Sequence, residues 1–377
     1  MSAFPRLIDD DTDGWLTEQL QASGAIAAGA RVVGHTWEPL EVQGGDSATT
    51  RLGLEYEGGT GPSSLIVKVA TSNAAMRELA VQRGVFQREV LFYQQFGAAL
   101  GEVVPRCHAA EISEAGDEFV LLLEDLSAGR VGDRIGFSVG DAEMALDGAA
   151  ALHGKFWEDE SLGRFAWLRT PDDELNPEGL AFGKRALNQS ADDCEARFGD
   201  AVPRIVTEAT RALARRLEAF HRYRDGRLLT LIHGDYHPGQ MLFPSEADGR
   251  FAIFDWQTVR LGTGAEDVGR VLVTGFNVEE RRAAEPGLLE RYYKALLRHG
   301  VGGYSRAEFD EDYRLAMYLS LMMTVAVVPR LSDEFLAERR ERSMRLGGED
   351  PVEGIFSTLA GSIEDHDLIG AIAALPE

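Results

Sequence analysis

The chain has 377 residues, and its 38 Lys and Arg against 62 Asp and Glu give a formal net charge of −24. Its apolar fraction of 44% and charged fraction of 27% are ordinary for a globular protein, and its length suits two structural units or one large bilobed fold. The acidic balance argues against nucleic acids and anionic membrane surfaces as partners, because both are bound through basic side chains.

Cysteine content and hydropathy bear on the compartment. Cys107 and Cys194 are too few for a disulfide framework, which favours a reducing cytoplasm. The first residues show no basic region followed by an apolar run. The most apolar stretch, Met317 to Pro329, is shorter than the roughly 20 residues that a bilayer requires. We therefore expect a cytoplasmic protein without a membrane partner, and the choice between monomer and homodimer stays open.

The first part of the chain predicts strands and one helix. Residues 52–56 and 64–70 are β-rich runs, and the glycine-rich segment 57–63 between them indicates a hairpin. From 73 to 100 the apolar residues recur at three- and four-residue spacings, which predicts a helix. Residues 119–123 form an apolar run of strand length.

The remainder is mostly helical in pattern. In chain order it contains a helix over 142–157, a polar segment over 167–200 that is irregular in its first part, an amphipathic helix over 206–223, strand-like runs at 228–232 and 251–254, and helical patterns from 279 to 375. The sequence thus predicts a small α/β lobe followed by a larger helical lobe, with the boundary near Leu126.

Two acidic residues stand where chemistry is expected. Asp235 follows the apolar run that ends at Ile232, and Asp255 follows the run that ends at Phe254. A carboxylate just past a strand is held on a rigid scaffold, which suits a proton acceptor or a ligand for a hard cation such as Mg²⁺. A third aspartate, Asp267, is expected instead to cap the helix that follows it.

Other chemistries fit the sequence less well. His233 and His237 have the spacing of a zinc-binding helix, but the glycines and the proline in this segment argue against a helix. Gly183-Lys184 is followed by Arg185 rather than by the Ser or Thr of a phosphate-binding P-loop.

The segment His233-Gly234-Asp235-x4-Gln240, with Asp255 twenty residues after Asp235, resembles the Brenner motif and metal-binding aspartate of the aminoglycoside phosphotransferase and choline kinase-like superfamily. Within it the chain looks closest to the ecdysteroid-kinase-like branch, over about residues 32–326. The resemblance implies an α+β, bilobal protein-kinase-like fold. Residues 1–126 would form a nucleotide-binding lobe with an antiparallel sheet and a helix, and residues 127–377 a mainly helical catalytic and acceptor-binding lobe.

The resemblance also implies an activity, namely transfer of phosphate from ATP, with Mg²⁺, to a hydroxyl of a small molecule. Asp235 would accept the proton or orient the hydroxyl, and Gln240 and Asp255 would hold Mg²⁺. His233 would support the loop by hydrogen bonding. His237 would contact the substrate or support the loop.

The nucleotide contacts follow from the same resemblance. Lys68, the only lysine on a strand-like run, would contact the α- and β-phosphates, and Glu89, with Glu78 as second choice, would hold it. The other expected contacts are a phosphate loop containing Gly44, Gly45, Ser47 and Thr49, and the backbone of Glu124 and Leu126, which would pair with adenine.

One departure from the family pattern opens alternatives. Gln240 stands where the family usually has Asn, and the longer side chain must still meet the strict octahedral distances of Mg²⁺. The alternative function is therefore a nucleotide-binding pseudokinase with a regulatory role. Among enzymes, a kinase for hydroxyacyl-CoA or a lipid-like alcohol competes with one for an antibiotic or a sugar. A protein kinase is disfavoured because the chain lacks an Ala-Pro-Glu segment.

Overall fold

The computed structural model describes residues 12–40, 47–245 and 249–376. The chain divides into two compact units: residues up to Arg130 with Leu242–Val259 form the first, and Val131–Met241 with Arg260–Glu377 form the second. The predicted α+β fold, with an N-terminal antiparallel sheet and a larger helical part, is confirmed. The division into lobes of residues 1–126 and 127–377 stays a prediction. A single boundary differs from the two units in one respect, because residues 242–259 belong to the first unit.

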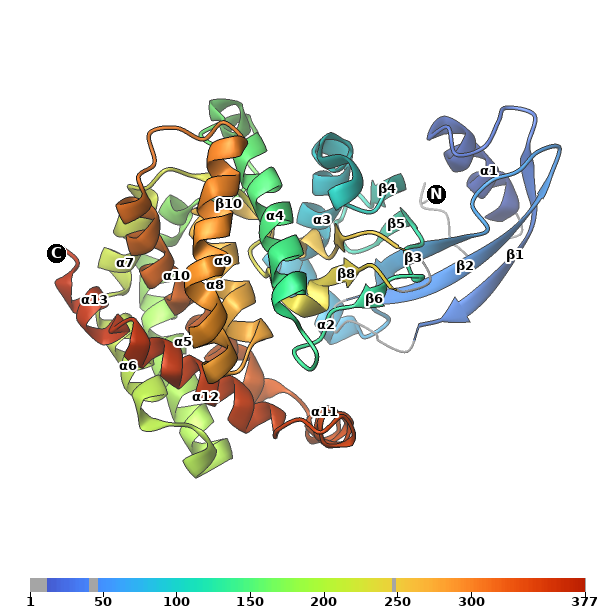
Figure 1. Cartoon of the computed structure of the whole chain (residues 1–377). Helices are drawn as coiled ribbons and strands as arrows, with labels where there is room; N and C mark the ends of the chain where they lie inside the picture. Colours follow the sequence, from blue (N-terminus) through green and yellow to red (C-terminus); the bar gives the residue numbers. More distant parts are fainter. Residues whose placement is uncertain (1–11, 41–46, 246–248, 377) are drawn as a thin grey trace. The chain divides into compact units, whose positions relative to one another are not determined.

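The first unit is built on a five-stranded antiparallel sheet of order β1-β2-β3-β5-β4 (Figure 1). Its strands are β1 (Arg31–Pro39), β2 (Ser47–Glu57), β3 (Ser64–Ala70), β4 (Cys107–Ile112) and β5 (Phe119–Glu124). The predicted hairpin is the antiparallel pair β2–β3, in which Leu52 lies opposite Leu65. Because side chains alternate along a strand, Leu65 and Val67 enter a core with Leu16 and Leu20 of α1 (Thr12–Ala22).

The residues between β3 and β4 form two helices rather than the single predicted helix over 73–100. Helix α2 (Ala74–Arg83) ends at Gly84, whose φ of 65° is left-handed and whose N–H donates to Ala80 and Val81 carbonyls. A glycine in this conformation satisfies carbonyls at a helix end, so the chain turns before α3 (Val85–Gln95). A 3₁₀ stretch, Gly97–Val103, follows α3.

The returning segment of the first unit packs on α3. It includes β9 (Ala252–Ile253) and a 3₁₀ turn, Trp256–Thr258. Trp256 is fully buried and its ring stacks on Phe92 of α3, with centroids 3.8 Å apart and planes 7° from parallel. The short strands β6 (Arg130–Val131) and β8 (Met241–Phe243) form a three-stranded sheet with β9, in the order β6-β8-β9.

The second unit is mainly helical (Figure 1). Its helices are α4 (Val139–Lys155), α5 (Pro177–Phe198), α6 (Arg204–Arg215), α7 (Leu217–Asp225), α8 (Gly264–Gly275), α9 (Val278–Arg298), α10 (Arg306–Val327), α11 (Asp333–Arg345), α12 (Pro351–Asp365) and α13 (Leu368–Ala374), and its strands β7 (Thr230–Ile232) and β10 (Arg260–Gly262) pair antiparallel. The helix predicted over 206–223 is two helices, α6 and α7, separated at Arg216. The segment 167–200 is irregular in its first part, as predicted, with a short 3₁₀ turn at Pro171–Glu174, and it then forms the 22-residue helix α5.

Helix α8 is the central element of this unit. It packs against α10 and α4, and most of its residues are buried. Small residues make this possible, since Gly269 lies against the backbone and Cβ of Ala316 in α10. A capping box between Thr263 and Glu266 begins the helix. Its first two turns therefore sit in a fixed position, and they carry residues that contact the Asp235 loop.

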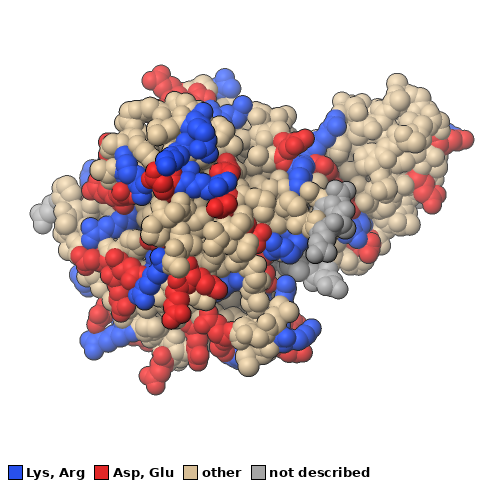
Figure 2. Space-filling view, viewed as in Figure 1, with Lys and Arg blue, Asp and Glu red and all other residues tan. Residues whose placement is uncertain are grey.

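Surface charge and hydropathy add little to the choice of partner. On the face drawn in Figure 2, acidic side chains are interspersed with Lys and Arg. Across the ranges that the structure describes, no single helix is long and apolar enough to cross a membrane. One bent pair, Arg306–Arg330 with Asp333–Arg345 at 111°, passes by length and composition alone.

Candidate active site

Three charged side chains from distant parts of the sequence meet in the first unit. Lys68 Nζ lies 2.8 Å from Glu89 Oε1 and 2.7 Å from Asp255 Oδ1. The side chains of Lys68, Glu89 and Asp255 are 11%, 2% and 18% exposed. The structure thus brings together three of the residues singled out in the sequence, and Glu78, the second choice for the lysine partner, bonds to Gln82 instead.

Local structure explains why these residues meet. The alternation of β3 buries Leu65 and Val67 on the α1 side, so Lys68 points to the opposite face. Glu89 is on the buried side of α3. Asp255 adopts a left-handed conformation, with φ 66° and ψ 61°, directly before the stacked Trp256. The backbone N–H of Trp256 also donates to the Glu89 carboxylate, which ties the returning segment to α3.

The charges of this cluster are unequal. Burial lowers the pKa of Lys68, but Asp255 and Glu89 more than offset it, so the pKa is raised and the ammonium stays charged. Burial and the nearby Asp255 raise the pKa of Glu89 to about 7, against the opposing effect of Lys68. When Glu89 is ionised, one ammonium between two carboxylates sums to a formal charge of −1. A divalent cation bound through oxygen atoms suits such a cluster.

The neighbouring strand presents two hydroxyl groups to the same face. Thr49 lies directly opposite Lys68 in the β2–β3 register, and Ser47 is two positions earlier on β2. Opposed residues, and residues two apart on one strand, share a face of the sheet. Both were expected in a phosphate loop, but the structure places them in β2. The other two predicted loop residues, Gly44 and Gly45, lie outside the described part of the chain.

The predicted adenine contacts lie at the end of β5. The N–H of Glu124 donates to the Arg106 carbonyl at 2.8 Å, and the Glu124 carboxylate accepts from Arg250 at 2.6 Å. The Leu126 carbonyl accepts from the Gly129 N–H at 2.9 Å. The Glu124 N–H and the Leu126 carbonyl thus already have partners within the protein, and the adenine pairing stays a prediction.

In the second unit, the loop after β7 carries Asp235 and is held by a buried aspartate. Asp267 is 1% exposed and accepts from the N–H groups of His233 at 2.8 Å and Gly234 at 2.9 Å. His153 Nε2 lies 3.2 Å from the same carboxylate. His233 Nδ1 in turn accepts from the Asp235 N–H at 3.3 Å. Gly234 has a φ of 85°, which only glycine adopts readily, so the turn requires this residue.

Asp267 corrects one sequence prediction. It was expected to cap the helix that follows it, but the N-cap of α8 is Thr263, which pairs with Glu266. Burial raises the pKa of Asp267, but its hydrogen bonds and the nearby His153 and His233 more than offset this effect, so the pKa is lowered. Asp267 is therefore a buried carboxylate that fixes the backbone of the Asp235 loop.

Asp235 itself is held by an arginine that the sequence did not reveal. Arg270 Nε donates to Asp235 Oδ1 at 3.0 Å, and His237 Nε2 lies 3.6 Å from Oδ2. Burial raises the pKa of Asp235, but Arg270, His237 and His233 together lower it below its usual value. Asp235 therefore stays ionised, with Oδ1 engaged by the guanidinium. The one feature of the sequence that could have indicated this contact is the spacing of Arg270, which follows Asp267 by three residues. This spacing places both side chains on the same face of α8.

Gln240 and His237 belong to the turn after Asp235. Gln240 ends the 3₁₀ turn Pro238–Gln240, and its N–H donates to the His237 carbonyl at 2.9 Å. His237 Nδ1 accepts from the Gly239 N–H at 3.1 Å, a contact within the loop itself. His237 therefore stabilises the turn. Gln240 lies in the second unit, whereas Asp255, the other predicted metal ligand, lies in the first.

One known protein family matches most of this chain. The sequence pattern of the ecdysteroid kinase-like family matches residues 46–300, which is more than half of the chain. The chain belongs to this family. The match includes both the lysine cluster of the first unit and the Asp235 loop of the second, and it confirms the superfamily predicted from the sequence.

Individual relatives are more distant. An uncharacterised kinase-like protein of Caenorhabditis elegans is 30% identical over 90 residues, so the match spans 24% of this chain and 24% of that relative. A solved structure from Ralstonia eutropha, assigned as an aminoglycoside phosphotransferase, is 15% identical with a TM-score of 0.50, covering 93% of this chain and 98% of the other. A microcompartment-associated aminopropanol kinase is 14% identical with a TM-score of 0.48, covering 97% and 99%. At 15% identity, the likeness to the Ralstonia eutropha structure is one of fold.

Proposed function

We propose that this member of the ecdysteroid kinase-like family is an ATP- and Mg²⁺-dependent kinase that phosphorylates a hydroxyl of a small molecule. The observation that carries the proposal is the buried cluster of Lys68, Glu89 and Asp255. Phosphoryl transfer needs a fixed cation for the phosphates and oxygen ligands for a metal, and this cluster offers both. We also propose a cytoplasmic location and a free small molecule as partner.

The first unit supplies the nucleotide half of the proposed chemistry. Lys68, kept charged by its two carboxylates, would neutralise phosphate oxygens, and the hydroxyls of Ser47 and Thr49 share its face of the sheet.

No group of three or more His, Cys, Asp or Glu side chains forms a metal cage within the ranges that the structure describes. This suits Mg²⁺, which proteins commonly bind through one or two carboxylates together with substrate phosphates. Asp255 would be one ligand and Gln240 another. Bound Mg²⁺ would neutralise charge on the transferring phosphate.

The second unit supplies the acceptor half. Asp235 is ionised, its loop is fixed by Asp267, and Arg270 occupies its Oδ1. Oδ2 is therefore the oxygen that would accept a hydrogen bond from the acceptor hydroxyl. A lowered pKa makes a weak base, so the main contribution of Asp235 would be to orient the hydroxyl, in keeping with the loose transition state of phosphoryl transfer.

A pseudokinase is the second candidate, and it is favoured by one observation, the Gln240 side chain in place of the family's usual Asn. A protein of that kind would bind ATP without consuming it. The two candidates therefore differ in turnover and agree in nucleotide binding.

The test uses Asp235→Asn with Asp225→Asn, an exposed helix-end residue, as the matched control. ADP release is measured against a library of hydroxylated metabolites with and without Mg²⁺, products are identified by mass spectrometry, and ATP affinity is measured by calorimetry. We expect Mg²⁺-dependent turnover that Asp235→Asn abolishes with little change in ATP affinity, while Asp225→Asn behaves as the wild type. Retained turnover in Asp235→Asn would remove this residue from the reaction. ATP binding without any ADP release would establish the pseudokinase.

A further inference from the structure

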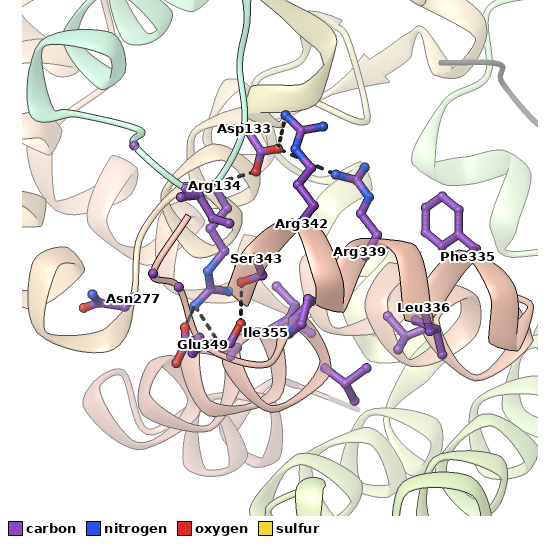
Figure 3. A pocket seen from close by; sticks show the side chains of 18 of the residues that line it. Asp133, Arg134, Asn277, Phe335, Leu336, Arg339, Arg342, Ser343, Glu349 and Ile355 are labelled. Atoms are coloured by element: carbon purple, nitrogen blue, oxygen red, sulfur yellow. Dashed lines mark hydrogen bonds and ion pairs between the residues drawn. The ribbon is translucent and has the colours of Figure 1, made fainter. Parts of the chain in front are cut away.

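A pocket of about 540 Å³ lies within the second unit (Figure 3). Volumes of this order are typical of sites for small organic ligands. Its walls come from the loop at 133–136, the start of α9, and helices α11 and α12 with the turn between them. Fourteen of its twenty lining residues follow residue 300, where the family match ends. The pocket is therefore mainly a feature of this chain's C-terminal part.

One side of the pocket is apolar. Phe335 and Leu336 of α11 and Ile355 of α12 line it. Phe335 is 41% exposed, although most large apolar side chains of this unit are fully buried. A concave apolar surface left open to solvent gains free energy when an apolar ligand covers it. This wall suits the hydrocarbon body of a ligand.

The other side presents arginines. Arg342 Nη2 lies 3.1 Å from Asp133 Oδ2, and Arg339 Nη1 lies 3.7 Å from the same oxygen (Figure 3). Two guanidinium groups share the one carboxylate of Asp133, so arginine exceeds carboxylate by one charge at this end, whereas the three arginines and three carboxylates of the whole lining balance. Their side chains are 52% and 47% exposed, which keeps N–H donors accessible to a ligand. Guanidinium donors of this kind match the geometry of a carboxylate.

Arg134 adds a buried donor to the same wall. Its Nη2 contacts Glu349 at 3.0 Å and Thr358 Oγ1 at 2.7 Å, whereas its Nη1 is buried without a hydrogen-bond partner in the described parts of the chain. An unsatisfied buried donor costs free energy, which a ligand oxygen would recover. The other lining carboxylate, Glu280, accepts from the Asn277 N–H at 3.1 Å and so helps to cap α9.

Helix α8 connects this pocket to Asp235. Arg270 of α8 binds Asp235, and Asn277, seven residues later, lines the pocket. Five helical residues rise about 8 Å and two extended residues add at most about 7 Å, so the Cα atoms of Arg270 and Asn277 lie within roughly 15 Å. A ligand anchored in the pocket must therefore be elongated if its other end is to reach Asp235.

We propose that the pocket binds the far end of the acceptor, which is an elongated alcohol with an apolar body and a carboxylate opposite the hydroxyl. Arg339 and Arg342 bind the carboxylate, Phe335, Leu336 and Ile355 contact the body, and the hydroxyl extends toward Asp235. This substrate class rests on the proposed kinase function, but binding to the pocket can be measured without ATP.

The test compares two probes with the full chain by calorimetry, below their aggregation limits. 10-Hydroxydecanoate carries a hydroxyl and a carboxylate at the ends of an apolar chain, and its methyl ester has the same body without the charge. We expect the acid to bind about tenfold tighter than the ester, as a charge-assisted pair at a partly exposed site allows. The double variant Arg339→Met/Arg342→Met should abolish this difference. Arg345→Met is the matched control, because Arg345 is on the same helix, is 70% exposed and pairs with Glu341 outside the pocket.

A second variant tests the apolar wall. Leu336→Trp fills the pocket and should weaken binding of both probes, with an unchanged midpoint of thermal unfolding showing that the fold is kept. Equal affinities for acid and ester, or an acid affinity that the double arginine variant leaves unchanged, would overturn the proposal, as would no binding of either probe. ADP release from other acceptors would still test the kinase in that case. Conversely, if the protein binds the acid through the two arginines but shows no turnover, the binding role of the pocket is supported and the kinase activity is rejected.

Discussion

Lys68 Nζ lies 2.7 Å from Asp255 Oδ1, although 187 positions separate the two residues in the sequence. The contact exists because the segment Leu242–Val259 returns to the first unit and stacks Trp256 on Phe92 of α3. The same ion pair keeps Lys68 charged inside the protein. One side chain therefore stabilises the returning segment and prepares a cation for phosphate, so stability and nucleotide binding should change together when it is removed.

Replacing Lys68 by Met should weaken both properties. The variant leaves Glu89 and Asp255 without their shared cation, and removing one partner of a buried pair costs about 3–5 kcal/mol. ATP affinity, measured by calorimetry, should fall at least about tenfold, since a charged hydrogen bond to phosphate is lost. Urea unfolding gives the change in stability. Lys155→Met, at the exposed end of α4, is the control and should change neither quantity. Wild-type ATP affinity in Lys68→Met would contradict the phosphate role.

Replacing Arg270 by Met should shift the pH dependence of the reaction. Arg270 favours the ionised form of Asp235, whereas burial disfavours it, so without the arginine the pKa of Asp235 rises. The acid limb of the kcat/KM profile should therefore move upward by about 1–3 pH units, with activity lost at acidic pH and partly kept at pH 8. Arg270→Lys retains the charge and should shift the limb less. An acid limb that does not move in Arg270→Met would show that Asp235 does not set it.

Some features could be predicted from the sequence because they depend on local patterns of residues. A single lysine on an apolar strand run, and two aspartates just past strand-like runs, identified Lys68, Asp235 and Asp255 as candidates. The hairpin 52–70 was equally clear, since a glycine-rich turn separates two β-rich runs. The family resemblance supplied Glu89, which periodicity alone would have treated as one helix charge among several.

Other features depend on contacts that no local pattern contains. Asp267 looked like a helix cap, and its actual partners, the N–H groups of His233 and Gly234, are more than 30 positions away. Arg270 binds Asp235 through the same long-range packing of α8. Two misses had local signals: the left-handed Gly84 that ends α2, and the Asn176-Pro177 start of the polar helix α5. Those signals were outweighed by the apolar spacing across 73–100 and by the polarity of 167–200.

The Gln240 side chain can be tested directly as a metal ligand. Gln240→Ala removes the amide oxygen and should raise the Mg²⁺ concentration for half-maximal ADP release by about ten- to a hundredfold, as losses at metal sites generally do. Gln240→Asn restores the amide that the family usually carries and should stay within a few-fold of the wild type. Identical Mg²⁺ dependence in Gln240→Ala and the wild type would exclude Gln240 as a ligand and leave Asp255 as the candidate.

His221 should make the stability of the second unit sensitive to mild acid. It is 5% exposed on α7, and its Nδ1 accepts from Arg224 Nη1 at 3.3 Å. Burial, and then Arg224, lower its pKa from 6.5 to about 4. The folded protein therefore resists protonation of His221, while the unfolded chain takes up the proton near pH 6.5. The contribution of His221 to the unfolding free energy is complete above pH 6.5 and is lost as the pH falls toward about 4, on the order of 3 kcal/mol in total.

Carboxylates also titrate in this pH range, so the informative quantity is the difference in unfolding free energy between variants. His221→Gln should flatten the fall in unfolding free energy between pH 7 and pH 4, measured by urea titration, and His299→Gln, at an exposed helix end, should follow the wild type. Parallel curves for His221→Gln and the wild type would mean that His221 is protonated as easily in the folded protein as in the unfolded chain.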